Sequence, residues 1–196
     1  MFLAVEGPNG VGKSTVVASL VTVLGVALGE DTAVVATREP SGSLLGQAAR
    51  AMESELSGAA LAMACAADRL HHVKTEIEPA LARGAWVVTD RYVPSSLVLQ
   101  RLDGMDTASI WALNETAPPP DLTVYLLDAP EIIAARLASR TPRSRLEATA
   151  TPALELALYA DAQQFLAGHG WNQLAIHAHG RTPGDIAAEI AAAALR

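Results

Sequence analysis

The chain has 196 residues, 51% of them hydrophobic but only 4% aromatic, which is enough for one compact domain that buries most of its apolar surface. One cysteine excludes a disulfide framework. A net charge of −7 excludes a broad electrostatic surface for nucleic acid or an anionic membrane, so local basic groups must hold any anionic ligand.

The N-terminus lacks the basic and long apolar regions of a signal peptide, so we expect a cytoplasmic protein. Beyond it, short β-branched segments alternate with longer Ala/Leu-rich segments of helical period, which predicts βαβ units and a parallel sheet. The predicted strands are 2–6, 32–37, 85–90, 122–128 and 173–178. The predicted helices are 13–28, 43–54, 57–82, 94–101, 106–116, 130–139, 152–168 and 182–195. No linker or repeat divides the chain, so residues 1–196 are expected to form a single α/β domain.

A glycine-rich loop follows the first predicted strand and opens the first helix. Its sequence satisfies the pattern G-x-x-x-x-G-K-[ST] in the strand-loop-helix context that phosphate binding requires. Backbone N–H groups can point at phosphate oxygens, and the helix N-terminus adds positive potential. Lys13 can bridge the β- and γ-phosphates while the Ser14 hydroxyl ligates Mg²⁺, so the loop predicts binding of a nucleoside triphosphate. The predicted loop ligands are Gly7, Asn9, Gly10, Val11, Gly12, Lys13, Ser14 and Thr15.

The remaining residues bear on two other classes of phosphate-loop protein. Switch GTPases read guanine with an Asn-Lys-x-Asp segment, and Lys74, the only other lysine, is followed by Thr75 and Glu76, which excludes that class. A motor or transporter ATPase uses a carboxylate at the end of a neighbouring strand. Asp90 and Asp128 occupy such positions, so this class is weakened but stays open.

Arginines follow two further predicted strands at the edge where the phosphate loop lies. Arg38 stands in Thr-Arg-Glu-Pro, and Arg91 stands in Thr-Asp-Arg-Tyr. Ligands of open α/β sheets bind at the carboxyl ends of the strands. Two guanidinium groups at one edge indicate a site for a second, acceptor phosphate.

In this order, the motifs resemble those of the thymidylate kinase family of nucleoside monophosphate kinases. The resemblance covers nearly the whole chain and implies a three-layer P-loop kinase fold with a five-stranded parallel sheet flanked by helices. It also implies transfer of the γ-phosphate of ATP to dTMP, which yields dTDP and ADP, and a homodimer. The matching segments are the phosphate loop, 37–40, 66–73, 79–84, 90–96 and 120–123.

The resemblance implies a role for individual residues at the acceptor site. Arg38 and Arg91 would hold the acceptor phosphate, and Arg69 would contact the edge of the base. Asp90 would place the water shell of Mg²⁺, and Glu39 would orient arginines or magnesium waters. The predicted acceptor-site residues are Asn9, Arg38, Glu39, Cys65, Arg69, Arg91, Ser96, Leu99 and Tyr159.

The donor side has an arginine-rich lid at about 139–149. Family members place a catalytic arginine either in the phosphate loop or in the lid, and this loop has none. The lid must therefore supply it, from Arg140, Arg143 or Arg145. Arg181, in the loop after the last predicted strand, is expected to border the adenine.

Three residues on the base and sugar side depart from the family pattern. Cys65 stands where an aromatic ring commonly stacks on thymine, and Leu99 where an aromatic ring crowds out a ribose 2′-hydroxyl. Asn9 stands where a carboxylate usually faces the sugar 3′-hydroxyl. All three departures concern recognition of the base and sugar rather than the handling of phosphate.

Loss of the stacking ring would remove on the order of 1 to 3 kcal/mol per base unless Met63 or Trp111 replaces it. Two alternatives to dTMP phosphorylation therefore stay open. One is the same chemistry on a different or modified pyrimidine nucleotide. The other is a noncatalytic nucleotide-binding regulatory module on the same fold.

Overall fold

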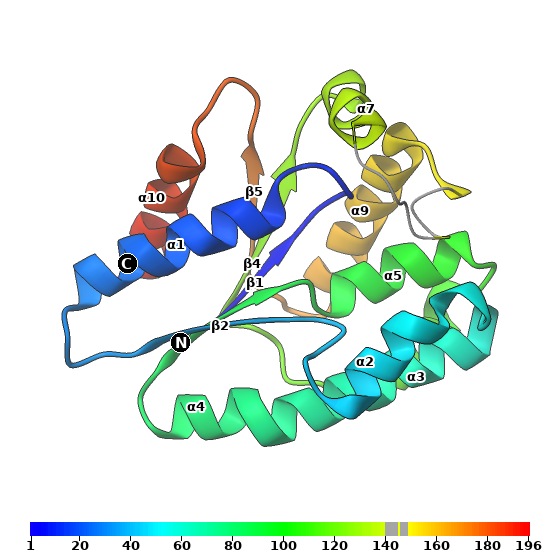
Figure 1. Cartoon of the computed structure of the whole chain (residues 1–196), viewed down its shortest axis with the longest axis horizontal. Helices are drawn as coiled ribbons and strands as arrows, with labels where there is room; N and C mark the ends of the chain where they lie inside the picture. The colour runs from blue at the N-terminus through cyan, green and yellow to red at the C-terminus, as the bar shows by residue number, and fades with distance from the viewer. Residues whose placement is uncertain (140–144, 146–148) are drawn as a thin grey trace.

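Five parallel strands form the central sheet in the order β2-β3-β1-β4-β5 (Figure 1). The computed structural model describes residues 1–139, 145 and 149–196. All five predicted strands are confirmed, with ends that shift by at most two residues. Their bounds are β1 (Phe2–Glu6), β2 (Val34–Arg38), β3 (Trp86–Asp90), β4 (Leu122–Leu127) and β5 (Gln173–His177).

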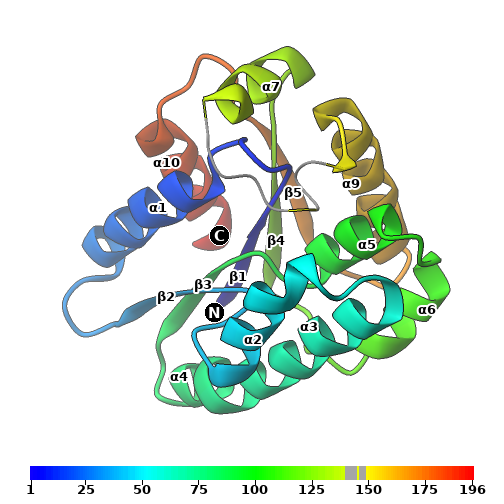
Figure 2. The same ribbon diagram turned by 45° about the vertical axis from the view of Figure 1, so that its right-hand side comes forward.

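Helices cover both faces of the sheet. On one face pack α1 (Lys13–Leu28), α7 (Pro130–Ala138) and α10 (Pro183–Ala194). On the other lie α3 (Gly58–His72), α4 (Glu78–Ala82), α5 (Val93–Leu102), α6 (Thr107–Asn114) and α9 (Pro152–Ala167). A short helix, α2 (Leu44–Ala51), runs beside α3 (Figure 2). The predicted α/β fold, with a parallel sheet between helical layers, is confirmed.

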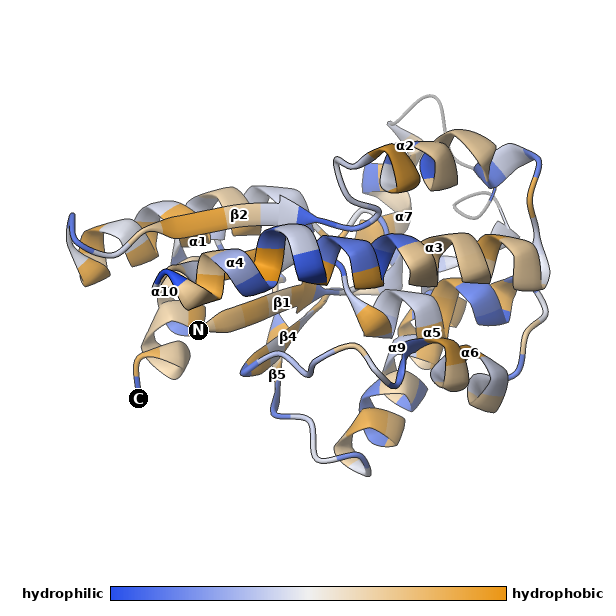
Figure 3. Cartoon of the chain, turned by 90° about the horizontal axis from the view of Figure 1, so that it is seen from below, coloured by the Kyte–Doolittle hydropathy of each residue, from blue (hydrophilic) through white to orange (hydrophobic). Residues whose placement is uncertain are grey.

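Alternating side chains of β1 supply the two hydrophobic cores. Phe2 and Ala4 point into the core beneath α5 and α9, whereas Leu3 and Val5 point into the core beneath α1 and α10. Figure 3 shows β1 and β4 as hydrophobic strands in the centre of the molecule. A strand buried on both faces reads as a continuous apolar run, which is why the sequence predicts it.

Two predicted helices are not continuous. The helix expected over 57–82 is α3, a π-helical turn (Val73–Ile77) and α4. Pro79 lies in the first turn of α4, where it lacks the N–H that an uninterrupted α-helix would use. The helix expected over 43–54 ends at Ala51 and continues as a 3-10 turn (Met52–Ser54).

The strand order places β1 between β3 and β4, so the loop after β1 lies where the connections diverge to either side. In α/β sheets this point, at the carboxyl ends of the strands, is where ligands bind. Arg38 of β2 is in register with Asp90 of β3, so both end at this edge. None of the helices in the described residues has the length and hydrophobicity needed to span a bilayer.

The loop between β2 and α2 is anchored on one buried carboxylate. Asp68 accepts hydrogen bonds from the Ser41 N–H and hydroxyl, both at 2.6 Å, and from the Ser43 hydroxyl at 2.9 Å. Gly46 lies against this anchor, because a Cβ there would be 2.3 Å from the Ser41 carbonyl oxygen. The close approach fixes α2 as one wall of the cavity described below.

We expect Gly46→Ala to lower the free energy of unfolding by roughly 1 to 3 kcal/mol, since overpacking a tight contact costs that much. Gly25→Ala is the matched control, because a Cβ on Gly25, inside α1, meets nothing within 4 Å. It should raise the free energy of unfolding by about 0.5 to 1 kcal/mol. Urea unfolding of both variants measures the difference, and equal stability of the two would contradict this packing.

Candidate active site

The phosphate loop needs glycine where its backbone turns. Gly7 has a φ of +137°, and a Cβ there would lie 2.4 Å from the Leu126 carbonyl oxygen. Gly12, with a φ of +107°, is the N-cap of α1 and makes no side-chain capping bond. The first-turn N–H groups of α1 therefore lack a side-chain acceptor and suit an anion.

Lys13 is buried and folds back over the loop. Its Nζ donates to the carbonyl oxygens of Gly7 at 2.7 Å and Pro8 at 2.8 Å. Burial, with the nearby positive charge of Arg91, lowers the pKa of Lys13 to about 7. A polyphosphate at this loop would favour the charged ammonium.

Ser14 and Asp90 form an oxygen pair at the start of α1. The Ser14 hydroxyl donates to Asp90 Oδ2 at 2.5 Å, and Asp90 Oδ1 is buried without a hydrogen-bond partner among the described residues. Hydroxyl and carboxylate oxygens suit Mg²⁺, so the pair fits that ion. No group of three His, Cys, Asp or Glu side chains in the described ranges could hold a metal. A cation here would take its other ligands from phosphate and water.

Arg91 has a φ of 78°, and among the described residues it is the only one other than glycine with a positive φ. Such conformations cost energy and gather at functional sites. The Arg91 guanidinium donates to Asn9 Oδ1, to the Ser95 hydroxyl at 3.0 Å and to the Tyr159 hydroxyl at 3.4 Å. Partners from the phosphate loop, α5 and α9 thus fix its direction.

Beneath Arg91 lies a carboxylate that the sequence analysis missed. Glu6 is fully buried at the end of β1 and accepts from the Tyr92 N–H at 2.6 Å and the Ser95 hydroxyl at 2.7 Å. Burial raises the pKa of Glu6, an effect that the Ser95 hydrogen bond and the charge of Arg91 oppose. A charged residue ending an otherwise apolar strand was the available signal.

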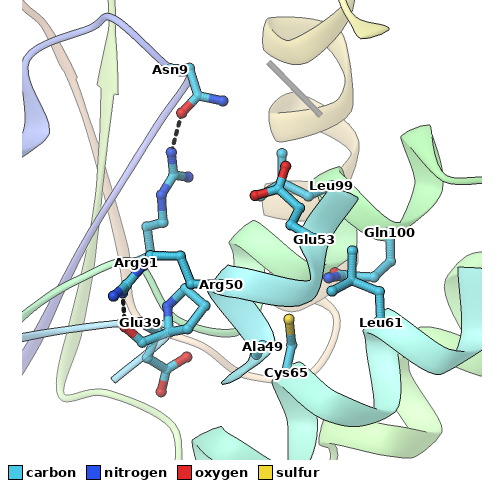
Figure 4. A pocket seen from close by; sticks show the side chains of 11 residues that line it. Asn9, Glu39, Ala49, Arg50, Glu53, Leu61, Cys65, Arg91, Leu99 and Gln100 are labelled. Atoms are coloured by element: carbon cyan, nitrogen blue, oxygen red, sulfur yellow. Dashed lines mark hydrogen bonds between the residues drawn. The ribbon is translucent and has the colours of Figure 1, made fainter. Parts of the chain in front are cut away.

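A cavity of about 300 Å³ opens beside Arg91 (Figure 4). A smaller cavity of about 40 Å³ shares Cys65, Leu99 and Gln100 with it. None of the described residues lining either cavity is aromatic. Of the candidate replacements for the ring, Met63 is 57% exposed, and Trp111 packs against Phe165 and His169.

Gln100 is the polar residue of this cavity that the sequence analysis missed. It is 3% exposed, and its Oε1 has no hydrogen-bond partner among the described residues. Figure 4 shows its amide directed into the cavity. A buried acceptor without a donor is costly, so this oxygen points to a ligand. The signal was a glutamine directly after the apolar run Leu97–Leu99 of α5.

Arg69, expected at the base edge, is held by three partners. It donates to Glu39 Oε2 at 2.6 Å, to Asn114 Oδ1 and to the Tyr92 carbonyl oxygen at 3.1 Å. Its guanidinium still lines the smaller cavity, together with Ser96. The arginine therefore reaches the site in a fixed orientation.

The remaining predicted arginines lie elsewhere. Arg38 is exposed at the end of β2 and lines neither cavity. Arg145 pairs with Asp103 at 2.6 Å, and Arg181 pairs with Glu189 at 2.7 Å. The other two lid arginines, Arg140 and Arg143, lie outside the described residues.

Arg136 of α7 is a further residue that the sequence analysis passed over. Its Nη1 donates to the Val11 carbonyl oxygen at 3.2 Å and lies 3.1 Å from Asp128 Oδ2. A basic side chain in the last turn of the helix before the lid was the signal. The contact places a second arginine, besides Arg91, against the phosphate loop.

A glycine-rich loop between β1 and α1 with a buried lysine, on a parallel sheet of this order, defines the class of P-loop nucleotide-binding proteins. Comparison with known proteins narrows the class. The family model described as thymidylate kinase matches residues 5–156. The chain therefore belongs to the thymidylate kinase family, and the resemblance stated from its motifs is confirmed.

Individual relatives agree with this assignment. The chain is 43% identical over 184 residues to a thymidylate kinase of Leifsonia xyli subsp. xyli, which covers 85% of each chain. It is 44% identical over 161 residues to a thymidylate kinase of Clavibacter sepedonicus, covering 76% of this chain and 73% of that one. A probable thymidylate kinase of Pyrobaculum aerophilum is 36% identical over 151 residues, 74% of each chain.

The lowered pKa of Lys13 predicts that ATP binding takes up a proton. Because the free protein has its Lys13 pKa near 7 and phosphate raises it, uptake approaches one proton at about pH 8 and vanishes below pH 6. ATP affinity should accordingly fall as the pH rises above 7. Calorimetry in buffers of different ionisation enthalpy measures the uptake.

Lys13→Arg should abolish this proton uptake, because arginine stays charged at these pH values. Lys74→Met is the matched control, since Lys74 is exposed on the surface and pairs with Glu78. Its uptake should equal that of the wild type. Equal uptake by the Lys13→Arg variant would contradict the assignment of the proton to Lys13.

Proposed function

We propose that the protein transfers the γ-phosphate of ATP to dTMP, which yields dTDP and ADP. Membership of the thymidylate kinase family makes it a nucleoside monophosphate kinase. The observation that carries the proposal is that Asn9 and Arg91 line both the phosphate-loop cavity, of about 200 Å³, and the larger acceptor cavity. Donor and acceptor phosphates would thus meet at these two side chains.

The reaction needs positioning more than acid–base chemistry. An anionic oxygen of the acceptor phosphate forms a bond to the γ-phosphorus while the bond to the bridging oxygen of ADP breaks, so no general base is required. Lys13 and the loop N–H groups would hold the donor phosphates, and Arg91 would hold the acceptor phosphate. Arg38 lines neither cavity, but it ends at the same sheet edge as Asp90 and is proposed as a second contact for that phosphate. Ser14 and Asp90 would hold Mg²⁺, which neutralises phosphate charge when bound.

The lid arginines Arg140, Arg143 and Arg145 are proposed to supply the charge that stabilises the transferring phosphoryl group. The support is sequence: the phosphate loop contains no arginine. One such arginine contributes about 10³- to 10⁵-fold to the rate in related phosphoryl transfer. Arg181 and Arg136 are proposed to border the adenine, because Arg181 lies in the loop after β5 and Arg136 of α7 contacts the phosphate loop at the Val11 carbonyl oxygen.

We propose that hydrogen bonds to the polar edge of the base, instead of stacking on its face, provide recognition. Gln100 Oε1 would accept from a ring N–H of the base, and Arg69 would donate to a ring carbonyl. Because no aromatic side chain of the described residues lines the cavity, a pyrimidine nucleotide other than dTMP is the second candidate acceptor. Cys65 contributes a neutral thiol, since burial raises its pKa to about 11.

We further propose that residues 1–196 form one domain that assembles as a homodimer. Large apolar side chains are exposed on neighbouring helices: Leu44 of α2 is 85% exposed and Met63 of α3 is 57% exposed. These exposed side chains on two helices that pack together support the proposal. Light scattering of the full chain measures its mass in solution.

The proposed reaction predicts ADP formation that depends strictly on an added nucleoside monophosphate. Lys13→Ala and Arg91→Ala should each lower turnover with dTMP by about 10³-fold or more, since each removes positive charge at the transferring phosphate. Circular dichroism should show the same fold in both. Near-normal turnover in either variant, or ATP binding without turnover in the wild type, would contradict the proposal.

Cys65→Phe tests what the missing ring does. A ring in the empty cavity should lower the KM for dTMP by about tenfold, because stacking on a base contributes roughly 1 to 3 kcal/mol. Cys65→Ser, close in size to the native residue, is the matched control and should leave the KM within about twofold. Assays with dTMP, dUMP and dCMP in parallel identify the preferred acceptor, and an unchanged KM in Cys65→Phe would contradict the placement of the base against Cys65.

A further inference from the structure

A buried carboxylate of α9 contacts the phosphate loop. Glu155 is 1% exposed, and its Oε2 accepts from the Asn9 N–H at 2.9 Å. The two residues are 146 positions apart in the sequence. Figures 1 and 2 both show α9 beside the end of β1, where the loop begins. Neither the motifs nor the proposed reaction uses this carboxylate.

Asn9 is held from two sides. Its backbone donates to Glu155, and its side-chain oxygen accepts from the Arg91 guanidinium. Asn9 thereby links α9 to the arginine that would hold the acceptor phosphate. One turn further along α9, Tyr159 accepts from the same guanidinium. Arg91 is therefore oriented by α9 twice, once directly and once through the phosphate loop.

Glu155 has no comparable task within its own helix. The N-cap of α9 is Thr151, whose hydroxyl already accepts from the Leu154 N–H. Glu155 lies one position beyond the site from which a glutamate completes a capping box. An acidic residue in a first turn gains some energy from the helix dipole, but that gain does not require burial. The hydrogen bond from the Asn9 N–H does require that the Glu155 carboxylate be buried.

The electrostatic surroundings agree with this placement. Residues 7–15 include no acidic side chain, so a carboxylate near this loop must come from another element. The negative charge of Glu155 favours the charged forms of Lys13 and Arg91, although its effect on the pKa of each is smaller than those of Glu6 and Asp90. Buried cations without carboxylate partners are strongly destabilising.

We propose that Glu155 is a positioning residue: it holds the Asn9 N–H so that Asn9 Oδ1 fixes the Arg91 guanidinium toward the acceptor phosphate. The proposal rests on the proposed function, which assigns that phosphate to Arg91. According to this proposal, acceptor binding depends on a hydrogen-bonding oxygen at position 155 and not on negative charge alone.

The test compares side chains at position 155 that change either the charge or the length of the residue. Glu155→Gln keeps an oxygen that can accept from the Asn9 N–H, so kcat/KM for dTMP should stay within about threefold of the wild type. Glu155→Asp keeps the charge but is one methylene too short, so kcat/KM for dTMP should fall about tenfold or more. The KM for ATP should change much less, because the Asn9 N–H is not among the groups left for the donor phosphates.

Asn9→Ala supplies the second arm. It removes the oxygen that holds Arg91 and leaves the backbone N–H to Glu155, so it should lower kcat/KM for dTMP as Glu155→Asp does. In the Asn9→Ala background, Glu155→Asp should add less than about twofold, because both changes act on the same link. Glu131→Gln is the matched control: Glu131 is an exposed acidic residue in the first turn of α7 and should have no effect.

Three results would overturn the inference. These are an impaired Glu155→Gln with a normal Glu155→Asp, independent effects that multiply in the double variant, and unchanged dTMP kinetics in Asn9→Ala. The measurement on Asn9→Ala tests the inference even if Glu155→Asp does not fold. Wild-type protein without dTMP turnover would contradict the proposed function instead, so the two failures are distinguishable.

Discussion

Two cations, the buried Lys13 and the half-buried Arg91, set the electrostatic constraint that the rest of the site satisfies. Burying an unpaired charge costs several kcal/mol, so each cation requires carboxylates or dipoles close by. Glu6 from β1, Asp90 from β3 and Glu155 from α9 supply them, and the Gly7 and Pro8 carbonyl groups hold the ammonium directly. A chain with a net charge of −7 can therefore present positive potential to two polyanions at one sheet edge.

In the same arrangement, contacts within the protein hold the side chains of the site in place. Arg91 keeps a left-handed backbone conformation because its side chain and its N–H, which donates to the Val5 carbonyl oxygen, are both held. Groups fixed in advance lose little entropy on binding and need little reorganisation as charge moves during phosphoryl transfer. The lowered pKa of Lys13 reflects the cost of this arrangement, and a bound polyphosphate relieves it.

How much the sequence predicts depends on whether the signal is local. The five strands and the phosphate loop follow from short patterns, and parallel pairing brings Arg38 and Asp90 to one edge without further information. Glu155 escaped prediction because its partner is 146 residues away and only tertiary packing brings them together. Gln100 and Glu6 were not predicted for a related reason. Each is unremarkable in its helix or strand sequence, and only the folded structure shows that its oxygen atoms are buried and need hydrogen-bond donors.

Burial also changes how the acceptor cavity can discriminate among bases. Stacking on an aromatic ring tolerates every base, because every base has a π-face. Where no aromatic side chain of the described residues lines the cavity, the proposed recognition of the base depends on Gln100 and on Arg69. Glu39, Asn114 and the Tyr92 carbonyl hold the Arg69 guanidinium in place. A base that offers no donor to Gln100 Oε1 leaves a buried acceptor unpaired, at a cost of about 1 to 3 kcal/mol. Sites built on such groups reject the wrong ligand more strongly than they attract the right one. Loss of the ring at Cys65 therefore weakens binding in general while it sharpens dependence on the edge of the base.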